Sequence, residues 1–155
     1  MIDQDLFRAV LGRFASGVTV VTVRDAAGVP HGMTVSAFSS LSLDPALILV
    51  CIGNEAATAP VMANARTFAV NVLRDDQEAV SRRFASPGGH RFDGIGYSDE
   101  GDPKLDGVLA WLQCRIVARH PAGDHEIYVG QIEQAGLHEG RPLLYYRGGY
   151  ATLER

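Results

Sequence analysis

The sequence predicts a single, mainly β domain whose strands are chiefly antiparallel. Residues 18–23 are almost wholly β-branched, residues 46–52 form an unbroken apolar run, and the last third alternates long strand-like stretches with turns. β-branched side chains suit a pleated sheet and are costly in a helix. Long antiparallel strands with few helices between them favour a barrel closed on itself over a doubly wound parallel sheet.

The first third of the chain predicts a helix, a hairpin and a buried strand. Leu6, Val10 and Phe14 recur at four-residue steps, which indicates a helix with Asp3 as its N-cap and Gly17 as its stop. A hairpin should follow, and then a strand that is apolar enough to be buried on both faces. The expected ranges are strand 18–23, turn 25–28, strand 29–35 and strand 46–52.

Two short helices and a long loop separate these elements from the final strands. Pro60 suits the first turn of a helix over 58–65, and acidic residues begin a helix over 75–84. No repeat or linker is visible, so residues 1–155 are expected to form one domain. The other expected elements are strand 67–73, a loop from 87 to about 106, and strands 109–119, 126–137 and 143–146.

Composition narrows the class of protein. The net charge of −4 gives no basic stripe for nucleic acid. Cys51 and Cys114 each lie in an apolar run, as expected of buried thiols in a reducing cytosol. The acidic N-terminus is unlike a signal peptide, and no apolar stretch reaches membrane-spanning length. We therefore expect a soluble, cytoplasmic protein.

Residues 32–40 concentrate hydroxyl groups at a turn-rich junction between two expected strands, with Thr34, Ser36, Ser39 and Ser40 among them. Hydroxyls and backbone N–H groups can bind the edge of a flat heterocycle such as the isoalloxazine ring of a flavin. The same residues also suit a loop in which Ser and Thr side chains cap their own backbone.

Two further segments could bind a phosphate. Residues 51–58 join the apolar strand to the start of a helix, where Asn54 and Thr58 would add side-chain donors to free N–H groups. Residues 82–92 gather three arginines and a histidine around a glycine-containing loop, which is equally consistent with a solvated helix end. The sequence has neither a Walker motif nor a Rossmann glycine motif.

His125 follows Gly123 and Asp124 at the turn before a long strand. It could act as a general base, a metal ligand or a donor to a ligand phosphate, or lie exposed in an Asx-type turn. The spacing of the other histidines and of the cysteines builds no metal site. No nucleophile elbow or pair of carboxylates points to a hydrolase.

The order of these motifs is more specific than any one of them. The series runs through residues 7–22, 32–45, 68–73, 84–85, 123–125 and 142–150. From about Phe7 to Tyr150 it resembles the short-chain flavin reductase family, the small partners of two-component flavin-dependent monooxygenases. The resemblance implies an antiparallel Greek-key split β-barrel that binds FMN, with a few peripheral helices. It also implies a homodimer with flavin sites near the subunit interface.

The resemblance further implies a role for each matching residue. The flavin ring would be lined by Met33, Thr34, Val35, Ser36, Ala37 and Ser39. The ribityl chain and phosphate would lie along Cys51, Ile52, Asn54 and Thr58, closed by Phe84 and Ala85. NAD(P)H would be held by His125, with Arg147 and Tyr150 near the nicotinamide. Residues 55–58 lack the serine that many relatives carry near Thr58, so both FMN and FAD remain open.

The implied activity is hydride transfer from NADH or NADPH to FMN or FAD, for which the protein mainly supplies orientation. Reduced flavin would then pass to a partner monooxygenase. Two alternatives stay open: a split-barrel flavoprotein of the pyridoxamine-phosphate oxidase type, and a non-catalytic flavin-binding electron carrier.

Overall fold

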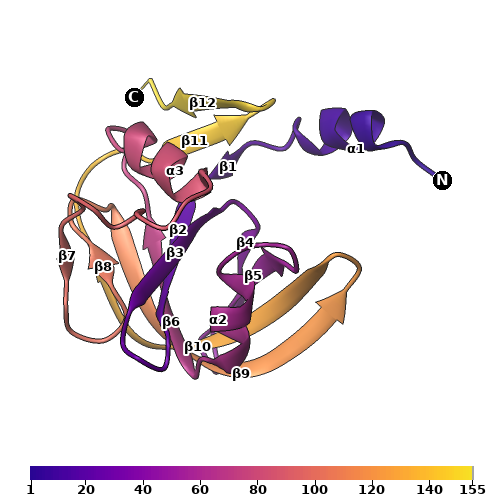
Figure 1. Cartoon of the computed structure of the whole chain (residues 1–155). Helices are drawn as coiled ribbons and strands as arrows, with labels where there is room; N and C mark the ends of the chain where they lie inside the picture. Colours follow the sequence, from indigo (N-terminus) through magenta and orange to yellow (C-terminus); the bar gives the residue numbers. More distant parts are fainter. Residues whose placement is uncertain (155) are drawn as a thin grey trace.

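A strongly curved antiparallel sheet dominates the molecule (Figure 1). The structure, a computed structural model, describes residues 1–154. The seven strands lie in the order β3-β2-β6-β9-β10-β5-β4. The prediction of a mainly antiparallel β fold is confirmed. The strands are β2 (Thr19–Arg24), β3 (Pro30–Val35), β4 (Phe38–Ser42), β5 (Leu47–Gly53), β6 (Thr67–Val72), β9 (Ala110–Ala122) and β10 (His125–Leu137).

Hydrogen bonding does not close this sheet into a barrel. Its two edges are β3 and β4, which are consecutive in the chain and joined by Ser36 and Ala37. The Phe38 amide donates to the Ser36 carbonyl, and β4 then pairs with β5 instead of β3. The expectation of a barrel closed on itself is therefore wrong in its hydrogen bonding. Residues 32–40 therefore contain parts of both edge strands, β3 and β4. We call the junction at which these two strands do not pair with each other the split.

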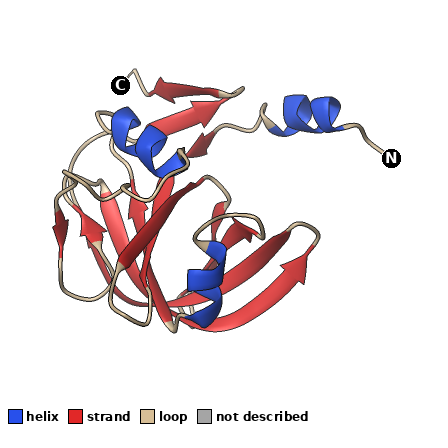
Figure 2. Ribbon diagram, viewed as in Figure 1, coloured by secondary structure: helices blue, strands red, loops and turns tan. Residues whose placement is uncertain are grey.

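A second, three-stranded sheet joins the two ends of the chain (Figure 2). It consists of β1 (Ser16–Gly17), β11 (Leu143–Tyr146) and β12 (Gly149–Thr152), in that order. Arg147 and Gly148 form the β11–β12 turn with φ values of 52° and 77°, as a tight hairpin requires. Neither β4 nor β12 was expected from the sequence, and the expected loop after residue 87 contains a short hairpin of β7 (Tyr97–Ser98) and β8 (Lys104–Leu105).

Three helices are described beside the strands: α1 (Gln4–Leu11), α2 (Ala59–Asn64) and α3 (Glu78–Ala85). Asp3 caps α1 as predicted, accepting a hydrogen bond of 2.9 Å from the Leu6 amide. The helix ends at Leu11 with Gly12 as its C-cap, instead of stopping at Gly17, and Ser16 and Gly17 pair with β11. Among the described residues, no helix is long and apolar enough to cross a membrane.

The main core fills the concave side of the large sheet. Phe68 is fully buried there, and Gly130 leaves room for it: a Cβ on Gly130 would lie 2.8 Å from Phe68 Cζ and 2.9 Å from Cys114 Cβ. Burial raises the pKa of the Cys114 thiol to about 12. The Cys51 thiol is half-buried, and both cysteines are free.

β5 corrects one expectation about this core. Its residues alternate between buried and half-exposed, so Ile48, Val50 and Ile52 face the core while Leu47 and Leu49 face outward. The expectation that this apolar run is buried on both faces is wrong within the single chain. A smaller core lies beneath α3, where Phe84 belongs to a buried cluster with Val18, Val20, Leu73, Leu105, Val108 and Leu143.

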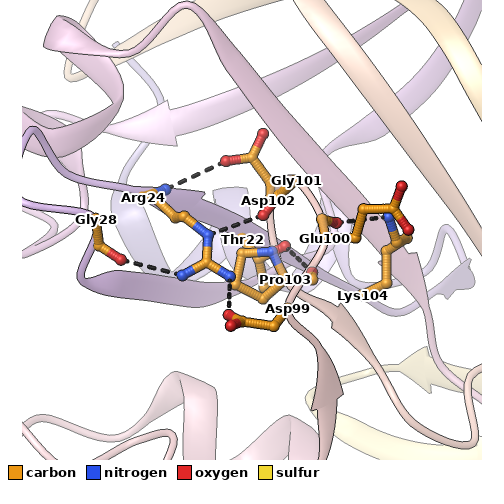
Figure 3. A network of polar contacts seen from close by, with 9 residues as sticks. All are labelled: Thr22, Arg24, Gly28, Asp99, Glu100, Gly101, Asp102, Pro103 and Lys104. Carbon is orange, nitrogen blue, oxygen red and sulfur yellow. Dashed lines mark hydrogen bonds and ion pairs between the residues drawn. The ribbon is translucent and has the colours of Figure 1, made fainter.

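A polar network fixes the loop before β8 to the large sheet (Figure 3). The Arg24 side chain donates to the Gly101 carbonyl at 2.8 Å and to the Asp99 carboxylate at 2.8 Å. The Thr22 hydroxyl donates to the Pro103 carbonyl at 2.6 Å. These contacts hold residues 99–103 against β2, far from them in sequence.

Candidate functional site

The face of β3 that α3 covers forms one wall of the candidate site. Gly32 and Thr34 lie two residues apart and therefore share this face. The Thr34 hydroxyl donates to the Ser81 carbonyl of α3 at 2.6 Å. A Cβ on Gly32 would lie 3.0 Å from the Phe84 ring, so glycine permits the close approach of α3. Hydrogen bonding and packing together fix α3 on β3.

A pocket of about 390 Å³ opens beside Gly32. Arg91 donates to the Gly32 carbonyl at 2.7 Å and to the Ser86 carbonyl at 2.9 Å, which places its guanidinium at the pocket. The Thr58 hydroxyl makes a long 3.5 Å contact with the same Gly32 carbonyl. The pocket is lined by Val29, Pro30, His31, Gly32, Ala57, Thr58, Gly88, Gly89, Arg91 and Phe92. This described lining contains no carboxylate, so it suits an anionic group such as a phosphate.

His125 and Asn54, seventy-one residues apart in the numbering, lie together where β5 pairs with β10. The Asn54 amide donates to the Asp124 carbonyl at 2.9 Å. His125 Nδ1 lies 2.7 Å from the Asp124 carboxylate, and hydrogen bonding to His125 lowers the pKa of Asp124. The imidazole lies along Gly53, with its side chain 49% exposed. The carboxylate therefore holds an accessible imidazole in a defined orientation.

Tyr150 lies on the other side of α3. Its hydroxyl shares a 2.6 Å hydrogen bond with the buried Ser81 hydroxyl. The Arg82 guanidinium lies 4.9 Å from the centre of the Tyr150 ring, in cation–π geometry. Tyr145 contacts the same ring edge-on at 5.3 Å. The structure thus joins two sequence-predicted residues, Thr34 and Tyr150, through Ser81.

The other predicted site residues differ in what they can offer a ligand. Val35 and Ile52 are buried in the core, so only their backbone groups are available. Met33 and Cys51 are half-buried. The exposed members are Ser36, Ala37, Ser39, Asn54, Ala85 and Arg147.

Sequence reasoning missed Ser81 and the orienting role of Asp124. A serine inside a helix carries no local signal for a ligand site. Its two hydrogen-bond partners, Thr34 and Tyr150, lie 47 and 69 positions away from it in the sequence. Asp124 was noted only as a neighbour of His125, and its proximity to the imidazole nitrogen was visible only in the structure.

An open antiparallel sheet with a pocket at its edge that is lined by Arg91 and Thr58 is the arrangement expected of a protein that binds a phosphate-bearing cofactor. Residues 11–154 match the family described as flavin reductase like domain, and the chain belongs to this family. It is an NAD(P)H:flavin oxidoreductase.

Individual relatives cover nearly the whole chain. An NADH-dependent flavin reductase of Rhodococcus sp is 43% identical over 150 residues, which are 95% of this chain and 85% of that protein. The reductase component of 4-hydroxyphenylacetate 3-monooxygenase from Thermus thermophilus is 44% identical, over 97% of each chain. The structure of a Streptomyces globisporus NADH:FAD oxidoreductase, in complex with NAD and FAD fragments, superposes with a TM-score of 0.91. It is 35% identical, over 96% of this chain and 92% of that chain.

Proposed function

We propose that the protein transfers a hydride from NADH to a flavin bound across the split between β3 and β4. The pocket beside Gly32 carries the proposal, because it combines the Arg91 guanidinium and the Thr58 hydroxyl with a carboxylate-free lining. The names of the relatives support NADH as the donor and both FMN and FAD as acceptors. When bound, the flavin supplies the hydride-accepting ring.

The two edge strands hold the flavin ring in this arrangement. Among the described strands, β3 pairs with β2 and β4 with β5, so no strand covers their outer edges. The carbonyls of Gly32, Ser36 and Ala37 already accept hydrogen bonds within the chain, which leaves the other backbone groups of these edges to meet a ligand. The ring edge would contact this backbone from Met33 to Ala37, with the Ser39 hydroxyl nearby. The phosphate would lie in the pocket beside Gly32, held by Thr58 and Arg91.

The nicotinamide nucleotide is held by the groups on either side of the ring. Asp124 orients His125, whose exposed imidazole would contact NADH. Tyr150 would offer a flat ring face to the nicotinamide, and Arg147 a cation to the phosphates. The protein thereby aligns two flat rings and needs no strong acid or base of its own.

Thr58→Val and His125→Ala are expected to weaken the binding of different ligands. Removal of the Thr58 hydroxyl should weaken FMN binding by about 1–3 kcal/mol and leave riboflavin, which has no phosphate, unaffected. Removal of the imidazole should raise the KM for NADH with little change in FMN affinity. Fluorescence titration and steady-state NADH oxidation measure the two quantities. An equal loss of affinity for FMN and for riboflavin in Thr58→Val would contradict the placement of the phosphate beside Thr58. An unchanged KM for NADH in His125→Ala would contradict the placement of NADH beside His125.

We also propose that reduced flavin passes to a partner monooxygenase, because several relatives are named as reductase components of such systems. Adding the oxygenase encoded nearest this gene should couple NADH oxidation to oxygenation of the partner's substrate. Uncoupled NADH oxidation with every such candidate would count against a partner monooxygenase.

A cytoplasmic location is part of the same proposal. The free thiols of Cys51 and Cys114 support it.

A homodimer is the assembly that the exposed apolar surface supports. α1 buries none of its residues, and Leu43 in the β4–β5 turn is 94% exposed. A two-fold dimer lets each copy cover such surfaces on the other. Light scattering should therefore give about twice the chain mass of 16.7 kDa, and a monomeric mass at micromolar concentration would contradict the proposal.

A further inference from the structure

Ser81 connects two parts of the site that belong to different sheets. It lies on α3 and is fully buried. Its carbonyl accepts a hydrogen bond from Thr34 of β3, and its hydroxyl bonds to Tyr150 of β12, each at 2.6 Å. One side of the residue therefore faces the strand of the proposed flavin ring, while the other faces the C-terminal hairpin.

The C-terminal hairpin is attached to the rest of the fold at both ends of its length. At the start of β11, the Leu143 amide donates to the Leu73 carbonyl at 3.1 Å, and Pro142 bridges to Arg74. Towards the other end, β1 pairs with β11, the Arg147 amide donates to the Gly12 carbonyl at 2.9 Å, and Ser81 shares a hydrogen bond with the Tyr150 hydroxyl. The Tyr150 ring also packs edge-on against Tyr145 and against the Arg82 guanidinium, and neither contacts its hydroxyl.

We infer that Ser81 is a positioning residue for the nicotinamide side of the site. Its hydroxyl fixes the orientation of the Tyr150 ring relative to β3, and so the distance between the ring and the flavin edge. This inference rests on the placement of NADH beside Tyr150 proposed above. Ser81 itself acts through Tyr150 and touches neither substrate. Loss of either hydroxyl breaks the same bond, so the two losses have a common effect.

The test is a double-mutant cycle of Ser81→Ala and Tyr150→Phe, with Tyr145→Phe as the matched control. Tyr145 loses the same hydroxyl from the same hairpin without breaking the bond to Ser81. At saturating FMN, each single variant should raise the KM for NADH about fivefold, and the double variant no further, since contacting residues are non-additive. The dissociation constant of FMN should stay close to that of the parent. Tyr145→Phe should retain the parental KM.

Three results would overturn the inference in an active parent enzyme. They are multiplicative effects in the double variant, an unchanged KM in Tyr150→Phe, or a rise in the FMN dissociation constant that matches the rise in KM. Tyr150→Phe keeps the test decisive if Ser81→Ala folds poorly, because its ring and packing remain. A parent protein that binds FMN but oxidises no NADH would instead overturn the proposed function, and the role of Ser81 with it.

Discussion

Replacing Phe68 by alanine is expected to lower the free energy of unfolding by about 3–5 kcal/mol, the usual cost of deleting a buried aromatic ring. The ring is fully buried on β6 and lies against the bare Cα of Gly130 and against Cys114. Because both neighbours belong to long paired strands, the surrounding backbone has little freedom to collapse into the space.

Phe14→Ala is the matched control for this variant, since it removes the same atoms from a side chain that is 82% exposed. Urea unfolding at a concentration that keeps the assembly state constant compares the two. The control should change stability by well under 1 kcal/mol unless the N-terminal segment is covered in an assembly. A loss of stability in Phe68→Ala no larger than in the control would contradict the described core.

Replacing Asp102 by alanine is expected to lower the free energy of unfolding by about 3 kcal/mol, because several hydrogen-bond donors lose a common charged acceptor. The carboxylate is 5% exposed and accepts hydrogen bonds from the Thr67 hydroxyl at 2.7 Å and the Gln113 amide at 2.8 Å. It also lies 3.3 Å from the Arg24 amide. The variant should release the loop over residues 99–103 from β2, β6 and β9.

Asp99→Ala separates this effect from the general loss of a negative charge. Asp99 lies in the same loop and pairs with Arg24 at 2.8 Å, but its side chain is 86% exposed. Exposed ion pairs contribute only about 0–1 kcal/mol. Thermal unfolding and hydrogen exchange of the loop amides should therefore distinguish Asp102→Ala clearly from Asp99→Ala. Similar losses of stability in both variants would show that the buried hydrogen bonds of Asp102 contribute little to the free energy of unfolding.

The elements that could be predicted from the sequence carry their signal locally. The β-branched residues before Arg24 indicate β2, and Asp3 indicates the start of α1. β4 was missed because its serines are polar and mostly exposed, and the strand exists only through pairing with β5. The outer face of β5 was misjudged because an apolar run does not reveal whether anything in the same chain covers it.

The residues of the candidate site also divide into those that the sequence could predict and those that it could not. Thr34, Thr58 and His125 were predicted because the order of motifs resembles a known family. Thr34 lies in β3, Thr58 directly before α2, and His125 at the start of β10. Ser81 was not predictable, since its contacts depend on how α3 lies between two sheets. A sequence shows which residue types are present, whereas the tilt of one helix decides which of them meet.

The pairing of Ser16 with Tyr145 has a consequence for how the protein is made. Strand β1 is synthesised before the strands of the large sheet, and its partner β11 after all of them. β1 cannot pair until β11 has been made, and closing so long a loop carries an entropic cost. A nascent chain that ends before residue 143 contains every strand of the large sheet and still lacks Tyr150. The small sheet, which carries Tyr150, thus forms only after the strands of the large sheet have all been synthesised.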